Sequence, residues 1–330
     1  MKKKSIIILM VMTLLGSTML TACNTTKVED KAASIEEAGS EEESKEFEPI
    51  TIDNYGREIS VKEKPQKVLT LGPNCSELFV ALGISNLIVG NALDNHSRGP
   101  LPEYKDAYDK IPELTYAEAN REAVLTSGAD FIYGIDWGFG EGALDIEELE
   151  ENGITVYVNA ATTMEEIYQE ITDLGNIFQI QESAEDFIAD QKARIKAVEE
   201  EVAGKEAVKV LVYDSGNDGV FTCSGTNFES VLISLAGGKN VFDDITEKQW
   251  LTVSYEEVLA REPDIIVIHD YDAPSVEEKI EEIKNNATLA QLDCVKNERF
   301  VIIELESVLP GNRMAYSVEK LSEAFYLDGN

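Results

Sequence analysis

The chain has 330 residues, and 63 Asp and Glu residues against 28 Lys and Arg residues give it a formal net charge of −35. Nucleic acid is excluded as a partner, because binding to a phosphate backbone needs clustered Lys and Arg. About 280 residues follow the N-terminal segments described next, enough for two lobes of ordinary domain size.

The chain begins with the features of an export signal. Three lysines at positions 2–4 precede an uncharged apolar run at residues 6–20, which is shorter than the roughly 20 apolar residues of a membrane-spanning helix. The run ends in the tetrapeptide LTAC at residues 20–23, which resembles the bacterial lipobox. The resemblance implies that residues 1–23 are a signal peptide and that lipidation of Cys23 anchors the exported protein to the outer face of the cell membrane. An ordinary cleaved signal with an incidental cysteine is the alternative.

Residues 24–48 form an acidic segment with almost no large apolar side chains. Such a segment cannot bury a core, and its self-repelling charge favours an extended chain. We expect a disordered tether between the anchor and the folded part. Beyond it lie Cys75, Cys223 and Cys294, which allow at most one disulfide. Cys75 and Cys223 are the pair that could meet, and three unpaired thiols are the alternative.

Short β-branched runs alternate with longer helical stretches, which is the pattern of βα units that build a mostly parallel sheet. The sequence predicts an α/β fold with two lobes, residues 49–181 and residues 205–330, each with a mostly parallel central sheet. The expected strands are residues 68–71, 87–89, 131–135 and 155–158 in the first lobe, and residues 208–213, 265–268 and 300–303 in the second.

Two helical patterns lie between the lobes. Thr163 with Glu166 opens the first, and Ser183 with Asp186 opens the second; both pairs resemble capping boxes. The second pattern predicts a single long helix at residues 182–204, roughly 30 Å long, that joins the lobes. Because it contains no Pro, we expect it to resist bending and to permit only a small closure of two preformed lobes.

The sequence contains an internal repeat. Its two copies have identical intervals and align Tyr116 with Trp250, Asn120 with Ser254, Glu122 with Glu256, and Asp130 with Asp264. Asn and Ser are good N-caps, and a glutamate in the first turn suits the helix dipole, so helix capping alone explains both glutamates. In two similar lobes, however, these carboxylates would occupy matched places on one face, a geometry suited to docking.

Several segments resemble the ABC-importer receptors for ferric siderophores, cobalamin and haem. These segments are residues 65–83, 149–158, 236–242 and 253–260. The resemblance of each one alone is weak, but their occurrence together in this order is specific. The resemblance covers roughly residues 50–326 and implies two lobes joined by a helical backbone, with no catalytic residues and no intrinsic cofactor. It also implies a membrane permease with its ATPase as partners, and pairing of Glu122 and Glu256 with arginines of the permease. We expect the receptor to be a monomer.

The ligand cleft should be lined by loops that follow strand ends, where open α/β sheets bind ligands. Tyr116, Trp250 and Arg313 match ligand positions of the family, and Asn74 belongs to the family's opening loop. A large flat ligand favours rigid aromatic walls. Core packing is the alternative for each aromatic residue. The further candidates for the cleft are Trp137, Phe139, Phe221 and His96.

The charges narrow the ligand only in part. A triply negative catecholate complex would need several convergent cations, and only Arg313 and Arg98 can be placed near the cleft. An iron(III) siderophore of the hydroxamate type is therefore expected, with a corrinoid or haem as the alternative. His96 and His269 could reach the cleft as axial ligands, although hydrogen-bonding roles are more typical, and two separated histidines do not make a metal site.

An extracellular enzyme and a non-transport sensor or scaffold are the rival classes. The sequence contains no G-x-S-x-G, H-E-x-x-H or Walker A motif, although its many carboxylates could include a hydrolytic pair. A sensor or scaffold on the same fold stays open, because fold does not fix function.

Overall fold

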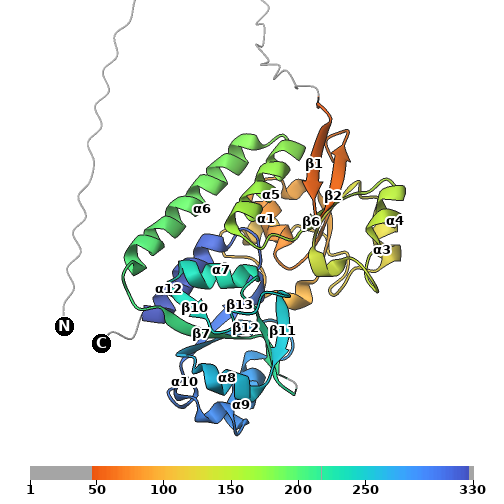
Figure 1. Cartoon of the computed structure of the whole chain (residues 1–330). Helices are drawn as coiled ribbons and strands as arrows, with labels where there is room; N and C mark the ends of the chain where they lie inside the picture. Colours follow the sequence, from red (N-terminus) through yellow and green to blue (C-terminus); the bar gives the residue numbers. More distant parts are fainter. Residues whose placement is uncertain (1–46, 217, 327–330) are drawn as a thin grey trace, which may run out of the picture. The chain divides into compact units, whose positions relative to one another are not determined.

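A computed structural model describes residues 47–216 and 218–326 (Figure 1). The predicted signal peptide, Cys23 and all but the last two residues of the predicted tether lie outside this part of the chain. Within it, no helix has the length and apolarity to cross a membrane. Phe47 already packs against the hydrophobic core, so the folded part begins inside the segment that was expected to be a tether.

The first lobe is built on a parallel sheet with strand order β4-β3-β5-β6, which confirms its four predicted strands. An antiparallel hairpin, β1–β2, precedes the sheet; its turn places Tyr55 and Gly56 at positive φ. The strands are β1 (Ile50–Asn54), β2 (Arg57–Val61), β3 (Val68–Leu71), β4 (Ile88–Ala92), β5 (Phe131–Ile135) and β6 (Thr155–Asn159). The helices are α1 (Cys75–Ala81), α2 (Lys105–Tyr108), α3 (Arg121–Thr126), α4 (Ile146–Glu151) and α5 (Met164–Ile177).

The second lobe repeats this plan with the parallel order β10-β7-β12-β13. It adds a three-stranded antiparallel sheet, β11-β9-β8, that the sequence did not predict. The strands are β7 (Val208–Tyr213), β8 (Ser215–Gly216), β9 (Val220–Cys223), β10 (Gly238–Asn240), β11 (Trp250–Val253), β12 (Ile265–Asp270) and β13 (Phe300–Glu304). The helices are α7 (Phe228–Leu235), α8 (Tyr255–Arg261), α9 (Val276–Asn285), α10 (Asp293–Lys296), α11 (Leu305–Val308) and α12 (Met314–Tyr326).

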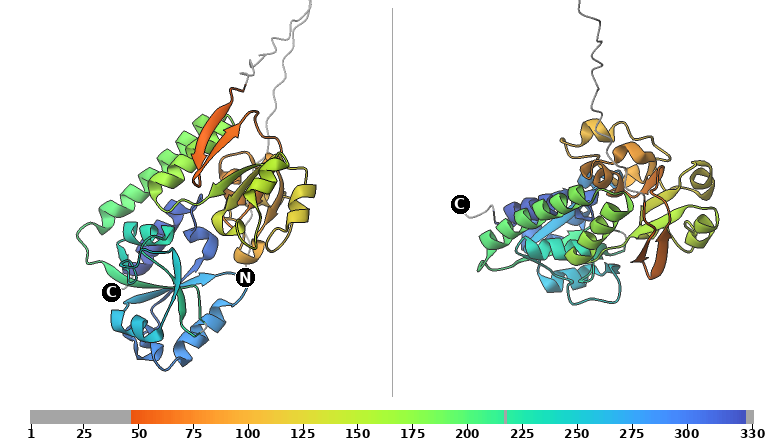
Figure 2. Two further views of the ribbon diagram at one scale, coloured as in Figure 1. Left: turned by 45° about the vertical axis from the view of Figure 1, so that its right-hand side comes forward. Right: turned by 90° about the horizontal axis from the view of Figure 1, so that it is seen from above.

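A single long helix, α6 (Gln181–Val202), connects the two lobes and packs against α5 and α12 (Figure 2). The capping box of Thr163 at the start of α5 is confirmed. The predicted cap at Ser183 is wrong, because α6 begins two residues earlier, after Ile180. Packing sets this start: Gly175 of α5 has no side chain, so Ala184 of α6 approaches it closely and is buried.

One hydrophobic core runs through both lobes, while two smaller clusters lie within the individual lobes. The shared core joins Phe79 and Phe178 of the first lobe to Phe228 and Met314 of the second. A continuous core of this kind opposes a wide hinge motion, because separating the lobes would expose apolar surface to water. Cys75, Cys223 and Cys294 are all buried and free, so no disulfide links the lobes.

The repeat has a structural role in each lobe. Asn120 caps α3 and Ser254 caps α8, as predicted. Asp130 accepts hydrogen bonds from the backbone N–H groups of Gln66 and Lys67, just before β3. Asp264 accepts one from Lys209 of β7 in the same way. The matched aspartates therefore align neighbouring strands in both lobes.

Candidate functional site

The carboxyl ends of the strands in the two lobes face each other across a small cavity, called here the inter-lobe cavity. Its volume is about 20 Å³, which is space for about one water molecule. The first lobe contributes residues that end or follow β5 and β6, and the second contributes residues from α7, β11 and the segment before α12. The lining residues are Ile135, Asp136, Trp137, Asn159, Ala160 and Ala161, together with Asn227, Phe228, Gln249, Trp250, Leu309 and Pro310.

Three predicted aromatic residues lie at this cavity or beside it. Trp137 and Trp250 line it from opposite lobes. Phe221 of β9 stacks on Trp250 of β11, with ring centroids 5.6 Å apart and an interplanar angle of 19°. The unpredicted antiparallel sheet thus supports an aromatic surface at the edge of the cleft.

Phe139 does not line the inter-lobe cavity, contrary to the prediction. Its side chain is buried in the core of the first lobe, with ring atoms so close to Gly134 that a Cβ there would lie 2.8 Å away. The glycine leaves the space that the ring fills. Phe139 is therefore an anchor for the loop that follows β5, and core packing was the correct alternative for this residue.

Tyr116 and His96 contact the opposite lobe near the surface. The Tyr116 hydroxyl donates to Asp272. Arg98 Nε donates to Asp270 at 2.7 Å, and the His96 ring stacks on Tyr271 with centroids 5.8 Å apart. The Tyr116–Asp272 and Arg98–Asp270 pairs are called the exposed inter-lobe contacts; Tyr271 itself is buried. These contacts hold the two rims of the cleft together.

Arg313 and Asn74 are buried between the lobes rather than exposed to a ligand. Arg313, 3% exposed, donates through Nε to both carboxylate oxygens of Glu77 at 3.1 and 3.0 Å. Asn74 donates through Nδ2 to the carbonyl oxygen of Pro310 at 2.7 Å. Both residues were predicted to contact the ligand, but in this structure each side chain binds protein atoms of the other lobe.

Glu306 completes this buried inter-lobe cluster and was missed by the sequence reasoning. Its Oε1 accepts from Ser97 Oγ at 2.9 Å and from the backbone N–H of Arg98 at 2.7 Å. Burial raises the pKa of Glu306 to about 7, although the charge of Arg313 opposes this shift. Oε2 is buried without a hydrogen-bond partner among the described residues. One acidic residue among 63 Asp and Glu residues gave no signal for this role.

His269 lies behind the aromatic surface and is fully buried, so it does not reach the cleft as an axial ligand. Its Nδ1 donates to Asp214 at 3.0 Å and its Nε2 donates to Glu229 at 3.1 Å. Burial alone would lower the pKa of His269, but the charge of Glu229 and the hydrogen bonds to both carboxylates outweigh it and raise this pKa to about 9. Neither partner is one of the carboxylates that follow His269 closely in the sequence, Asp270 and Asp272. The edge of Trp250 rests against the imidazole ring at 6.0 Å, so the buried cluster supports the cleft from below.

Glu122 and Glu256 occupy the second position of α3 and of α8, and both are exposed. Neither side chain forms an ion pair within residues 47–216 and 218–326. The capping carboxylate in the second lobe is instead Glu257, which accepts from the backbone N–H of Ser254. In the same described ranges, no group of three or more His, Cys, Asp or Glu residues could hold a metal ion.

Residues 68–305 match the family described as periplasmic binding protein. The chain belongs to this family. Members are binding proteins of transporters and not enzymes. This chain is a solute-binding protein of an ABC transporter. Such proteins are exported and work with a membrane permease and an ATPase.

Individual relatives agree with the family. The chain is 24% identical over 322 residues to an uncharacterized ABC transporter substrate-binding lipoprotein, YvrC, of Bacillus subtilis, covering 96% of this chain and 95% of the relative. It is 28% identical over 211 residues to a vitamin B12-binding protein of Photorhabdus laumondii, covering 63% of this chain and 72% of the relative. A periplasmic binding protein of Veillonella parvula shares the fold, with a TM-score of 0.75 over 84% of this chain and 97% of the other, at 24% identity.

Proposed function

We propose that this protein is an exported lipoprotein that captures an uncharged or cationic iron(III) hydroxamate between its lobes and delivers it to a permease. The observation that carries the choice of ligand is the state of the arginines. Arg98 is paired with Asp270, and Arg313 is paired with Glu77 and Glu306. Neither is free to neutralise an anionic chelate, and a desolvated anion without cationic partners is costly to bind.

The surroundings of the inter-lobe cavity are acidic. A hollow of about 450 Å³ adjoins it and shares Asp136, Ala160, Ala161 and Gln249 with it. Its wall adds further carboxyl groups, those of Asp53, Glu166, Glu170 and Asp173. This acidic wall disfavours a triply negative catecholate and the carboxylates of haem, and it suits a neutral or positive chelate.

A corrinoid is the second candidate, favoured by a specific observation. The curated relatives include vitamin B12-binding proteins, among them those of Photorhabdus laumondii at 28% identity and Vibrio campbellii at 23% identity. A corrinoid carries uncharged amide side chains and also fits an acidic, aromatic cleft. It is larger than a ferric trihydroxamate, so it requires a wider opening of the lobes.

Ligand entry requires movement, since a cavity of about 20 Å³ is far below the several hundred Å³ of ordinary ligand pockets. The exposed inter-lobe contacts are the pairs that would separate. The shared hydrophobic core and the buried pair of Arg313 with Glu77 would stay closed and limit the motion. Docking would follow through Glu122 and Glu256, with the protein held at the membrane by Cys23.

The test is a titration of intrinsic tryptophan fluorescence with a ferric trihydroxamate, cyanocobalamin, a ferric tricatecholate and haem. We expect quenching by the trihydroxamate, or by cyanocobalamin if the second candidate is correct, because Trp137 and Trp250 line the cavity. Replacement of Trp250 by Phe should reduce the quenching. Tightest binding of the tricatecholate or of haem would contradict the charge argument, and no response to any of the four would contradict the proposed function.

A further inference from the structure

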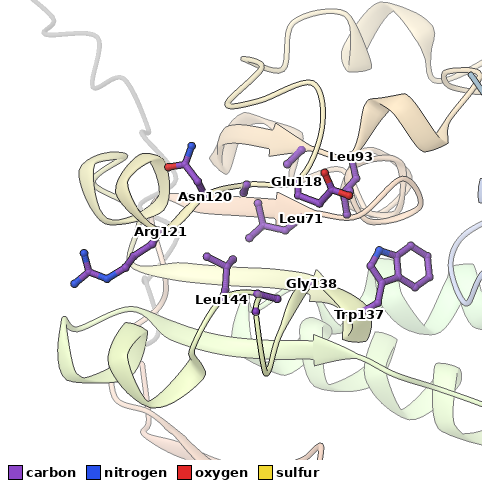
Figure 3. Close-up of a pocket in the computed structure, with 12 residues that line it drawn as sticks. Leu71, Leu93, Glu118, Asn120, Arg121, Trp137, Gly138 and Leu144 are labelled. Atoms are coloured by element: carbon purple, nitrogen blue, oxygen red, sulfur yellow. The ribbon is translucent and has the colours of Figure 1, made fainter.

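A further cavity lies within the first lobe and shares Trp137 with the inter-lobe cavity. Figure 3 shows the residues that line it. Its volume is about 400 Å³, against about 20 Å³ between the lobes. The lining is mostly aliphatic or glycine, with polar groups at the rim. The residues are Leu71, Ala92, Leu93, Ala119, Gly138, Gly142, Ala143 and Leu144, together with Glu118, Asn120, Arg121 and Trp137. We call this space the annex.

The walls of the annex are held by backbone hydrogen bonds, so the space is preformed. On one side, Gly140 N–H donates to the Leu144 carbonyl at 3.0 Å and Leu144 N–H donates to the Gly138 carbonyl at 3.2 Å. On the other side, Leu93 N–H donates to the Ala117 carbonyl at 3.2 Å. Phe139, buried over Gly134, fixes the loop of residues 138–144 from behind.

The annex adjoins the cleft between the lobes at Trp137. Leu71 ends β3, Ala92 ends β4 and Trp137 follows β5, so the annex lies at the carboxyl edge of the sheet, where ligands bind in this class of fold. Trp137 lines the annex and the inter-lobe cavity alike and is 40% exposed. Figure 3 shows Trp137 at one end of the lining residues and Arg121 at the other end, where the Arg121 side chain points away from the cavity.

The charged groups at the rim do not point to an ionic ligand in the annex. Arg121 is paired with Glu148, and Asn120 uses its side-chain oxygen to cap α3 through the N–H of Ala123. Glu118 is exposed to solvent. A preformed space of this size with aliphatic walls favours an uncharged apolar group, because burial of apolar surface is its main source of affinity.

We infer that the annex binds an uncharged, largely apolar arm of the chelate whose metal centre occupies the cleft between the lobes. Trp137 lies at the junction and contacts both parts of the ligand. The inference rests on the proposed function, and it adds that the preferred chelate carries an acyl or aromatic arm. A compact chelate without such an arm would leave the annex unused.

The experiment uses the full chain and two kinds of probe. The first is an uncharged naphthylamine dye, whose emission rises in apolar surroundings. The second is a pair of ferric trihydroxamates that differ only by an apolar arm. Ala119→Phe fills the annex, and Ala143→Phe fills it from the exposed loop should the first variant fold poorly. Ala197→Phe, on the exposed face of α6, is the matched control. Thermal unfolding reports whether each variant is folded.

We expect one dye per chain, displaced by the armed chelate and not by the armless one. We expect the armed chelate to bind at least about tenfold more tightly than the armless one, since several buried CH₂ groups give that much. Ala119→Phe should abolish dye binding and the difference in affinity between the two chelates. Ala197→Phe should change neither. Equal affinities of the two chelates, or dye binding that Ala119→Phe leaves unchanged, would overturn the annex alone. Failure of both chelates to bind beside normal dye binding would overturn the proposed function, and the annex as a subsite with it.

Discussion

The two lobes share a strand order and a repeated capped helix, yet they differ in what they bury behind the strand ends. In the first lobe, Glu170 accepts from Asn159 Nδ2 at 2.7 Å and from the Tyr133 hydroxyl at 3.1 Å, and burial raises its pKa to about 7. In the second lobe, His269 lies between Asp214 and Glu229 with a pKa raised to about 9. One lobe thus buries a carboxyl group among neutral partners, and the other buries a charge-compensated cluster. The capped helices that carry Glu122 and Glu256 are repeated, while the interior has diverged.

The largest loss of stability is expected when the charge compensation in the second lobe is removed. His269→Leu removes the cation between Asp214 and Glu229, leaving Lys279 as the nearby cation, with its Nζ 2.7 Å from the His269 carbonyl oxygen. Breaking a buried pair by removing one partner costs about 3–5 kcal/mol. Urea unfolding at pH 7 measures the loss. Tyr133→Phe, which removes one hydrogen bond from the neutral network of the first lobe, should cost only about 1–2 kcal/mol. Equal losses in the two variants would break the comparison.

The pH dependence of stability should separate the two lobes. Both His269 and Glu170 have pKa values raised above the ordinary 6.5 and 4.5, so each favours the folded state below its ordinary pKa and loses that contribution as pH rises through its folded pKa. The contribution of Glu170 to the unfolding free energy is therefore lost between about pH 4.5 and 7, and that of His269 between about pH 6.5 and 9. Each contribution is on the order of 3 kcal/mol.

The measurement is the free energy of unfolding at pH 5, 7 and 9 for the unmodified chain, Glu170→Gln and His269→Gln. Glu170→Gln should remove only part of the fall in unfolding free energy between pH 5 and 7, because burial also raises the pKa of Glu306 to about 7. His269→Gln should remove the fall in unfolding free energy between pH 7 and 9. Burial lowers the pKa of Lys279 to about 8, so this residue makes the unfolding free energy rise with pH above pH 8. Because all three proteins contain Lys279, the differences between them are compared. A slope that stays unchanged in both variants would contradict the assignment.

The sequence allowed the parallel strands and the two helix caps of the repeat to be predicted, because β-branched runs and N-cap residues are local signals. Asn120 and Ser254 cap their helices as the repeat indicated. Side-chain partners far apart along the chain were not predictable. The Glu77–Arg313 pair spans 236 positions, and His269 turned to Asp214 and Glu229 instead of the adjacent aspartates. The antiparallel strands that carry Phe221 and Trp250 are only four residues long, and their pairing depends on tertiary contacts.

The repeated glutamates should act alike although the interiors differ. Glu122→Gln and Glu256→Gln are each expected to slow association with the permease several-fold, and the double variant by about tenfold, because rim charges mainly steer encounter. Ligand affinity should not change. The readout is ligand-stimulated ATPase activity of the reconstituted transporter at low and high salt. Glu277→Gln is the matched control, since Glu277 is also exposed and at the second position of a capped helix, α9, but lies outside the repeat. An effect confined to one lobe would show that the repeat does not mark the docking face.

The smallest effect on stability distinguishes a contact between the lobes from a contact within one. Arg98→Gln removes the exposed pair with Asp270, and Lys284→Gln removes the exposed pair with Glu298 inside the second lobe. Exposed pairs contribute about 0–1 kcal/mol, so both variants should unfold within about 1 kcal/mol of the unmodified chain. Only Arg98→Gln should raise the rate of chelate binding, because the rims that it joins must separate before a ligand can enter a cavity of about 20 Å³. Stopped-flow tryptophan quenching measures this rate. If Arg98→Gln and Lys284→Gln bind at the same rate, the exposed inter-lobe contacts do not control access, and opening would instead be limited by the core that the lobes share.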